Sequence, residues 1–437
     1  MRFIGRIEHF GSLIYDTERK EYIPIDQDGT NIILNVSPNV DLETLYYKYF
    51  SHRFSYLNFK SFLQLIQSIE MIDKDYNSNV VFLENSDLEF FLNNKFISAP
   101  LKVHIALTYE CHLKCRHCFS NSGKKSEEEK NSELSPEKIM EFLDEIKENG
   151  VFYVSFGGGE PFLKKEFIEI LKKANQNKMN ISISTSLSSI NAKQIIETMQ
   201  KENIKIQEFK ISVEAVNSKE YTNVRGKNLF ENLKNNLQLI INYKKENDTF
   251  IRFSFVLNKQ NYSFLPNFLS FAEQYSADGL VFYPIYNVGR AQEHPESFLT
   301  NQELEKIQRM INNMKERTKI EIEFFNIPLK FGKNGLYNNF GCGCGKTTIY
   351  LDPHGNILPS GMFIKYGRKF SLGNIKEKKF KEIWKENVEK ELNKIEADPK
   401  CNNCMYFEEC KGGCMFRSFD KYQKLSYKDP TCTINPL

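Results

Sequence analysis

Three of the ten cysteines in this chain lie within eight residues, at Cys111, Cys115 and Cys118. No cysteine occurs from residue 119 to residue 341, and the other seven lie beyond that stretch. The chain shows no export signal, and in a reducing compartment clustered cysteines bind metal or carry out redox chemistry more often than they form disulfides. The spacing therefore predicts two metal-binding regions.

The first region has the pattern Cys-x3-Cys-x2-Cys directly after a predicted strand at 103–107. Structural zinc takes four ligands, and no fourth cysteine lies nearby, although His112 or His117 could complete a zinc site. A cubane iron–sulfur cluster held by three thiolates keeps one iron open to a small bidentate ligand. We expect such a cluster, and zinc is the alternative.

A glycine-rich turn, GGGEP at 157–161, follows the second predicted strand about 40 residues after the cysteines. Together the two motifs resemble the signature of the radical S-adenosylmethionine (SAM) superfamily, which holds the SAM amino group at this turn. Glycines let backbone approach a ligand closely, and a carboxylate accepts hydrogen bonds from an ammonium. The resemblance implies that Gly158, Gly159, Glu160 and Pro161 bind SAM.

Further cofactor contacts are implied at the ends of later strands and inside the cysteine loop. At the third strand Ser186-Leu187 replaces the Asn-Gly that is common in the family. The resemblance implies that Ser212 and Arg225 contact the methionine carboxylate or the ribose. A guanidinium suits bidentate binding of a carboxylate, and a plain surface arginine is the alternative. The residues implied are Thr185, Ser212, Glu214, Arg225 and His117, the last in the position of an aromatic that packs on the cofactor.

The resemblance also implies a mechanism. SAM chelates the open iron, one electron enters the sulfonium, methionine leaves, and a 5'-deoxyadenosyl radical abstracts a hydrogen atom from the substrate. The protein positions the substrate, excludes water and keeps the cluster potential low. A flavodoxin or ferredoxin-type protein is the expected reductant.

The second region, Cys401-x2-Cys404-x5-Cys410-x3-Cys414-x17-Cys432, resembles the core of the SPASM domain, which holds two auxiliary iron–sulfur clusters. The resemblance assigns four of these cysteines to a distal cluster, with Cys414 and Cys344 left for a proximal one. Ser360 stands where a further proximal cysteine is expected. The remaining ligand of the proximal cluster is Cys342, Ser360 or a substrate group. A proximal cluster that lacks a ligand could bind a substrate thiolate directly, and the alternative is an ordinary redox relay with an unusual ligand.

Strands and helices alternate over about residues 101–310. The strand candidates are at 103–107, 152–156, 181–184, 208–213, 251–257 and 280–284, and the helices between them at 136–148, 166–176, 192–202, 230–244 and 264–275. Repeated strand–helix units imply a parallel sheet with right-handed crossovers. We expect an α/β fold, a partial (β/α)6 barrel, with its site at the carboxyl ends of the strands.

Residues 1–95 read as a separate, winged-helix-like unit. Short strands are expected at 13–15, 22–25 and 31–36, helices at 42–49 and 59–69, and a returning strand at 79–83. The outline resembles the domain with which ribosomal-peptide maturases bind a leader peptide as an added strand. A structural cap and a DNA-binding winged helix are the alternatives. Residues 335–437 are expected to form the SPASM domain, with one helix at 380–395.

Lysine and arginine exceed aspartate and glutamate by only three, and no run of 18 apolar residues occurs. Neither nucleic acid nor a membrane is therefore an expected partner, and we expect a cytoplasmic protein.

The function expected is radical modification of a precursor peptide, with a cysteine thioether as product. A carbon–carbon cross-link is the next alternative. Formylglycine formation of the sulfatase-maturase type is less favoured, because those enzymes carry an acidic base at the position of Gly361. Outside this class, the alternatives are an electron carrier without SAM chemistry and a leader-binding scaffold.

Overall fold

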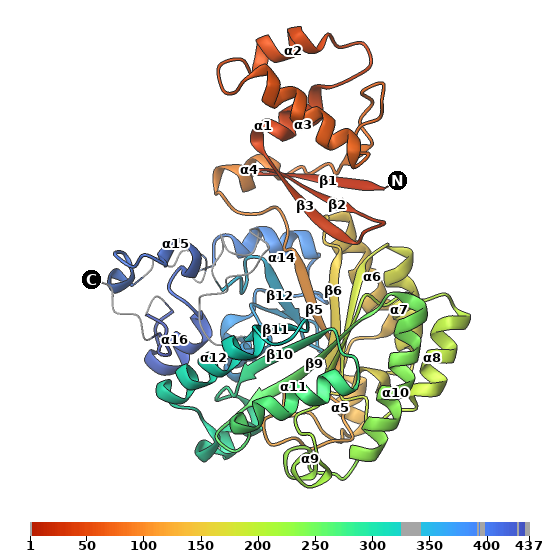
Figure 1. The fold of residues 1–437 in the computed structure, drawn as a ribbon, viewed down its shortest axis with the longest axis vertical. Coiled ribbons are helices and arrows are strands. Elements are labelled where there is room, and N and C mark those ends of the chain that lie inside the picture. The colour runs from red at the N-terminus through yellow and green to blue at the C-terminus, as the bar shows by residue number, and fades with distance from the viewer. Residues whose placement is uncertain (1, 325–341, 391–392, 394–397, 426–427, 433–437) are drawn as a thin grey trace.

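The structure is a computed structural model that describes residues 2–324, 342–390, 393, 398–425 and 428–432 (Figure 1). Its centre is an open sheet in the order β11-β10-β9-β8-β7-β6-β5-β12-β13-β14. Seven consecutive parallel strands form most of it: β5 (Lys102–Thr108), β6 (Tyr153–Gly158), β7 (Asn180–Thr185), β8 (Glu208–Ser212), β9 (Phe250–Leu257), β10 (Gly279–Pro284) and β11 (Glu321–Phe324). The six predicted strands are confirmed, and β11 is additional.

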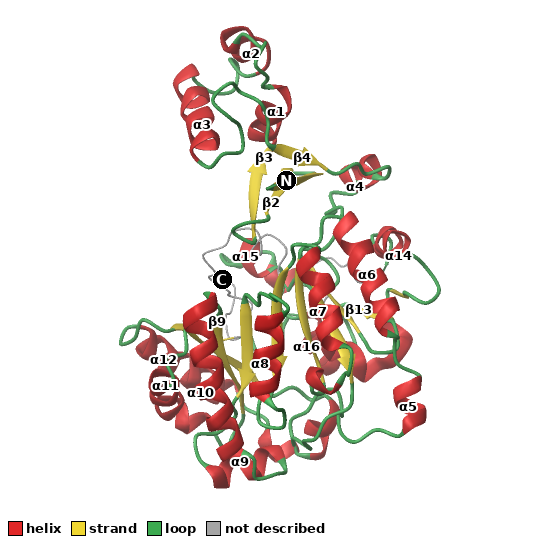
Figure 2. Cartoon of the chain, turned by 90° about the vertical axis from the view of Figure 1, so that its right-hand side faces the viewer, coloured by secondary structure: helices red, strands yellow, loops and turns green. Residues whose placement is uncertain are grey.

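Helices cover the outer face of this sheet (Figure 2). They are α6 (Pro136–Glu148), α7 (Phe167–Gln176), α8 (Ala192–Lys201), α10 (Phe230–Asn247), α11 (Leu265–Gln274) and α12 (Asn301–Lys315), with the short α5 (Glu127–Asn131) and α9 (Ser218–Arg225) in loops. On α6 the buried residues Ile139, Phe142, Leu143 and Ile146 follow helical spacing and face the sheet. On β5, Val103 and its alternate neighbours enter the same core, so the intervening side chains face the concave side.

The N-terminal unit has a sheet and an apolar core of its own. β1 (Phe3–Glu8), β2 (Gly11–Asp16), β3 (Glu21–Asp26) and β4 (Val80–Phe82) form a sheet in the order β3-β2-β1-β4. Against it pack α1 (Gln27–Asn35), α2 (Leu42–Tyr49) and α3 (Tyr56–Ser68), and α4 (Leu88–Asn93) leads to the barrel. The predicted strand at 31–36 is wrong: the Asp26 side chain accepts a hydrogen bond from the Gly29 amide at 2.8 Å and caps a helix through this β-branched run.

The β2–β3 hairpin contacts the amino ends of the barrel strands. Tyr15 stacks on Phe152 with ring centroids 4.3 Å apart. The Tyr22 hydroxyl donates to the Gly150 carbonyl at 3.0 Å and accepts from the Phe152 amide at 2.7 Å. The N-terminal unit therefore lies at the end of the barrel opposite the carboxyl ends of the strands, as Figure 1 shows.

The C-terminal region continues the barrel sheet. β12 (Thr348–Leu351) pairs in parallel with β5, and β13 (Asn356–Leu358) and β14 (Gly373–Asn374) follow antiparallel. Three short helices, α14 (Phe380–Asn387), α15 (Phe407–Cys410) and α16 (Met415–Tyr422), complete it. The helix predicted at 380–395 ends at Asn387, a buried residue whose side-chain amide donates to the Gly345 carbonyl at 2.7 Å. Among the described residues, no helix combines the length and the apolar character needed to span a bilayer.

Candidate active site

Cys111, Cys115 and Cys118 lie in the loop that follows β5, and the end of α9 holds this loop on one side. The amide of Lys114 donates to the carbonyl of Arg225 at 3.1 Å, and that of Arg116 to the carbonyl of Val224 at 3.0 Å. These bonds occupy carbonyls at the carboxyl end of α9, which lack partners within the helix. The helix end thereby fixes the loop backbone on both sides of Cys115.

Arg290 holds the same loop from the other side. Its Nε donates to the carbonyl of Cys115 at 2.8 Å, and its Nη2 to the carbonyl of Ser122 at 2.7 Å. The preceding Gly289 has φ +60°, and a Cβ there would lie 2.2 Å from the carbonyl oxygen of Cys118. Sequence reasoning missed Arg290, because no motif marks an arginine that is brought to the site by the fold alone.

The three thiols are shielded from solvent to different degrees: Cys115 is buried, and Cys111 and Cys118 are half-buried. Burial raises the pKa of Cys111 to about 12 and also raises that of Cys115. Iron binding must therefore displace protons from these thiols. Among the described residues, no three His, Cys, Asp or Glu side chains converge as they would around a single metal ion.

Glycines join the end of β6 to the cysteine loop. Gly158 has φ +118°, and a Cβ there would lie 2.3 Å from the carbonyl oxygen of Thr108; at Gly159 it would lie 2.0 Å from that of Glu110. The Gly159 amide donates to the Thr108 carbonyl at 2.8 Å. These glycines thus allow two protein segments to approach, and Pro161 then begins the 3-10 turn Pro161–Leu163.

Glu160 is fully buried and bonded to the end of β7. Its Oε1 accepts from the Thr185 hydroxyl at 2.7 Å, and its Oε2 from the Ser186 amide at 3.0 Å and hydroxyl at 2.7 Å. Burial raises the pKa of Glu160, although the bonds from Ser186 and Thr185 oppose this. Ser186, at the position of the family's common Asn, therefore holds the carboxylate directly. The Phe162 backbone bonds to the same carboxylate, so Glu160 is fixed from both the glycine-rich turn and the end of β7.

The remaining predicted contacts gather around Cys115. Nη1 of Arg225 lies 3.4 Å from the Cys115 sulfur, and its Nη2 donates to the Ser212 carbonyl and lies 3.7 Å from Glu214 Oε1. His117 Nε2 is 3.5 Å from the same carboxylate oxygen. Burial raises the pKa of Glu214, but His117 and Arg225 outweigh it and leave the pKa below its ordinary value.

The residues of this site fit a [4Fe–4S] cluster and SAM, the two groups that the motifs imply. Three thiols without a fourth match a cluster with one open iron. Arg225 Nε is buried and has no hydrogen-bond partner among the described residues, so it can still donate to an anionic group. The fold thus brings all the predicted SAM-site residues to the carboxyl ends of β5 to β8.

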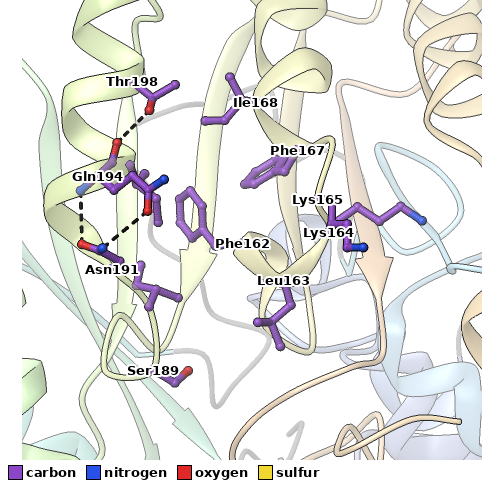
Figure 3. Close-up of a pocket in the computed structure, with 12 residues that line it drawn as sticks. Phe162, Leu163, Lys164, Lys165, Phe167, Ile168, Ser189, Asn191, Gln194 and Thr198 are labelled. Carbon is purple, nitrogen blue, oxygen red and sulfur yellow. Dashed lines mark hydrogen bonds between the residues drawn. The ribbon is translucent and has the colours of Figure 1, made fainter. Parts of the chain in front are cut away.

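A pocket lies just outside this group, between α7 and α8 (Figure 3). Phe162 and Leu163, which directly follow the glycine-rich turn, lie on one side of it, with Asn191, which caps α8, and Gln194 of α8 across from them. None of the predicted site residues lines this pocket, so it is separate from the predicted SAM site.

The C-terminal cysteines divide into two groups. Burial, Asp398 and the thiols of Cys432 and Cys404 raise the pKa of Cys401, and burial with Cys432 and Cys401 raises that of Cys410 to about 12. These four cysteines therefore lie near one another. They match the four-ligand set expected for the distal cluster.

The second group consists of Cys342, Cys344 and Cys414. The sulfurs of Cys342 and Cys344 are 3.2 Å apart, and contact with Cys342 raises the pKa of Cys414 well above its ordinary range. The Pro359 carbonyl accepts from the Gly345 amide at 3.2 Å. Ser360, next to Pro359, therefore lies beside this group.

An ion pair connects the two groups. Asp429 is buried and accepts from Arg417 Nη2 at 2.7 Å, from the Cys414 amide at 2.8 Å and from the Thr431 amide at 2.9 Å. Arg417 Nη1 donates to the Tyr286 hydroxyl at 3.2 Å. Sequence reasoning missed this pair, because neither residue belongs to the cysteine pattern.

Known proteins share this architecture. The radical SAM superfamily model matches residues 105–272, and the model of an iron–sulfur cluster-binding SPASM domain matches residues 342–405. Mycofactocin maturase MftC of Mycolicibacterium smegmatis is 27% identical over 343 residues, 77% of this chain and 83% of that protein.

Two solved structures are similar in fold. Streptococcus suis SuiB bound to its precursor peptide SuiA has a TM-score of 0.73 at 19% identity, covering 99% of each chain. The native anSMEcpe structure with bound AdoMet has a TM-score of 0.56 at 17% identity, covering 76% of this chain and 94% of that one. The chain therefore contains a radical SAM domain and a C-terminal SPASM domain, and the cofactors of these domains are SAM, a [4Fe–4S] cluster and auxiliary iron–sulfur clusters.

Proposed function

We propose that this enzyme modifies a ribosomally made precursor peptide and that residues 1–95 bind the leader of that peptide. The observation that carries the proposal is the free edge of β3. This strand pairs only with β2 among the described residues, and most of its side chains are at least partly exposed. A peptide can add to such an edge through main-chain hydrogen bonds.

The same unit carries most of the exposed large hydrophobic residues of the described chain. Of the eight exposed large hydrophobic residues among the described ones, six lie in residues 1–95: Leu34, Tyr47, Tyr49, Leu57, Leu65 and Val81. A peptide partner is further supported by SuiB, whose fold covers 99% of this chain and which was solved with a precursor peptide.

When bound, the [4Fe–4S] cluster and SAM supply the chemistry of the family, reductive cleavage of SAM to methionine and a 5'-deoxyadenosyl radical. The three loop cysteines would hold the cluster, with Arg225 beside the Cys115 sulfur. Glu160, oriented by Thr185 and Ser186, would accept from the SAM ammonium. A hydrogen bond and a positive charge at a cluster sulfur adjust the reduction potential.

For the product we propose a cysteine thioether. The proximal group offers three cysteines, with Ser360 beside it in place of a fourth, so a substrate thiolate can complete its ligand set. At Gly361 a Cβ would lie 2.9 Å from a Phe119 ring atom and 3.1 Å from one of Tyr350. No acidic side chain fits there without moving both rings, which argues against the formylglycine alternative.

For the reductant we propose an acidic flavodoxin or ferredoxin that docks over the cysteine loop. Lys114 and Arg116 are exposed on either side of Cys115, and Lys227 follows the end of α9. Among the described residues none of the three has a carboxylate within ion-pair distance, so their charges are available to an acidic partner. Charge reversal at Lys114 and Arg116 should slow SAM cleavage driven by flavodoxin and leave dithionite-driven cleavage unchanged.

The test uses the full chain, anaerobically reconstituted with iron and sulfide and incubated with SAM, dithionite and a cysteine-bearing precursor encoded beside the gene. We expect 5'-deoxyadenosine and a loss of two hydrogen atoms per link, and fragmentation should show a thioether at the cysteine. A link between two carbons would instead show the carbon–carbon alternative. Peptide binding without a mass change would indicate a scaffold, and a protein that cleaves no SAM would be an electron carrier.

The same peptide without its leader provides the control for the N-terminal unit. If residues 1–95 bind the leader, modification of the leaderless peptide should fall strongly. Equal modification of both peptides would identify these residues as a structural cap.

A further inference from the structure

Two tyrosine hydroxyls are buried beside the cysteine loop without a hydrogen-bond partner among the described residues. Tyr109 directly follows β5, and Tyr350 belongs to β12, which pairs with β5. Buried hydroxyls nearly always have a partner, because desolvating one without a bond costs about 1–3 kcal/mol. Such a pair at the carboxyl end of a barrel strand therefore calls for a ligand.

Both rings lie in an apolar corner on the concave side of the sheet. On β12, Ile349 and Leu351 enter the core beneath the outer helices, so Tyr350 between them faces the opposite side. There Tyr350 and Tyr109 pack with Ala106, Leu358 and Ile364.

The corner adjoins the third cysteine of the loop. The ring of Phe119, the residue after Cys118, meets that of Tyr350 edge-on with centroids 6.3 Å apart. The corner thus lies between the radical SAM cysteine loop and the C-terminal region.

Both phenols are neutral donors. A tyrosine hydroxyl has an ordinary pKa of about 10, so neither acts as a base near neutral pH. The nearby carboxylate of Asp352 is already engaged: it accepts from the amides of His354 and Asn356 and from the Asn356 side chain, at 2.8–2.9 Å. The two hydroxyls adjoin each other, but a bond between them would still leave one O–H without an acceptor.

We propose that Tyr109 and Tyr350 bind a backbone carbonyl oxygen of the peptide substrate and so hold the reacting residue beside the cluster. A carbonyl is the acceptor that fits two neutral donors in an apolar corner, because a carboxylate there would be desolvated without a countercharge. This role of the two tyrosines rests on the proposed function, because it requires a peptide substrate. Tyr109 and Tyr350 are then the residues that position that substrate.

The test compares Tyr350→Phe and Tyr109→Phe with the wild-type enzyme and the precursor peptide. Each variant keeps the ring and removes one donor. The ratio of modified peptide to 5'-deoxyadenosine should fall about three- to tenfold, the factor that one hydrogen bond supplies. SAM cleavage itself should continue. The melting temperature should change little, because the free protein loses at most the contact between the two hydroxyls.

Tyr243→Phe is the matched control, since the buried Tyr243 hydroxyl donates to the Ile204 carbonyl at 3.1 Å, away from the site. It should lower the melting temperature and leave the product ratio unchanged. If the wild type modifies the peptide normally and the ratio is unchanged in both Tyr109→Phe and Tyr350→Phe, the carbonyl-binding role of the two tyrosines is wrong. The proposed function would not be affected by that result. If the wild type cleaves SAM and modifies no peptide, the proposed function fails and the assignment fails with it.

Discussion

The two cysteine-bearing regions of this enzyme are organised by different forces. The loop with Cys111, Cys115 and Cys118 follows a buried strand and is fixed by main-chain bonds to α9 and by the Arg290 side chain. Around the cysteines at 401–432 the helices are short, α15 having four residues and α16 eight. The barrel thus fixes its cysteine loop by bonds within the protein, whereas we expect the C-terminal region to gain part of its folding free energy from metal binding.

The largest difference between the regions should appear in single cysteine variants. Cys115→Ala should reduce 5'-deoxyadenosine formation to the level without enzyme, because the SAM-binding cluster loses a ligand, and circular dichroism should show an intact fold. Cys404→Ala should retain SAM cleavage and lose iron. The measurements are product analysis and iron content under anaerobic conditions. If Cys404→Ala also lost SAM cleavage, the two cysteine-bearing regions would not differ in their contribution to this reaction.

Metal removal should separate the regions structurally. After chelation of iron, we expect hydrogen exchange to accelerate by orders of magnitude at described residues 398–425 and to change little in β5 to β10. The reason is that the barrel retains its apolar core, whereas the C-terminal cysteines lose the bonds that join them. Equal acceleration in both regions would show that the barrel also requires metal.

The Arg417–Asp429 pair should be the most sensitive point of the C-terminal region apart from its thiols. Removing one partner of a buried ion pair costs about 3–5 kcal/mol. Asp429→Asn should therefore destabilise this region and lower the iron content, because Asp429 holds the Cys414 amide near Cys432. Asp420→Asn, in the half-exposed pair with Lys365, is the control and should have a smaller effect. The measurements are iron content and thermal unfolding.

A glycine pair tests how firmly the barrel holds its loop. Gly289→Ala should destabilise the protein by about 1–3 kcal/mol and weaken SAM binding, because its Cβ meets the Cys118 carbonyl oxygen at 2.2 Å and its φ is +60°. Gly367→Ala also has a positive φ, +56° with ψ −134°, but no atom lies within 4 Å of its Cβ, so it should cost backbone strain alone, about 1–3 kcal/mol, and leave SAM binding unchanged. Equal melting temperatures for the two variants would show that the cysteine loop moves to accommodate the added methyl group.

Sequence reasoning succeeded where periodicity and short motifs carry the information. The strands and helices of the barrel were predicted because their apolar residues recur at regular spacing over several turns. The strand predicted at 31–36 was wrong. Ile32 and Ile33 favour a strand by propensity, but the hydrogen bond from the Asp26 cap stabilises a helix over these residues. Arg290, the Asp429 pair and the Tyr109–Tyr350 corner were missed, since each depends on contacts between segments far apart in the chain.

The pairing of β12 with β5 makes the cluster-rich tail a constituent of the catalytic scaffold. Severing the chain before residue 342 would bare the main-chain donors and acceptors along β5, and an uncovered strand invites pairing with other molecules. A truncated barrel should therefore be aggregation-prone even though it retains all the residues that we propose to contact SAM. The C-terminal region therefore cannot be exchanged between such enzymes as an independent module. The incoming region must supply a strand that can pair with β5 in place of β12.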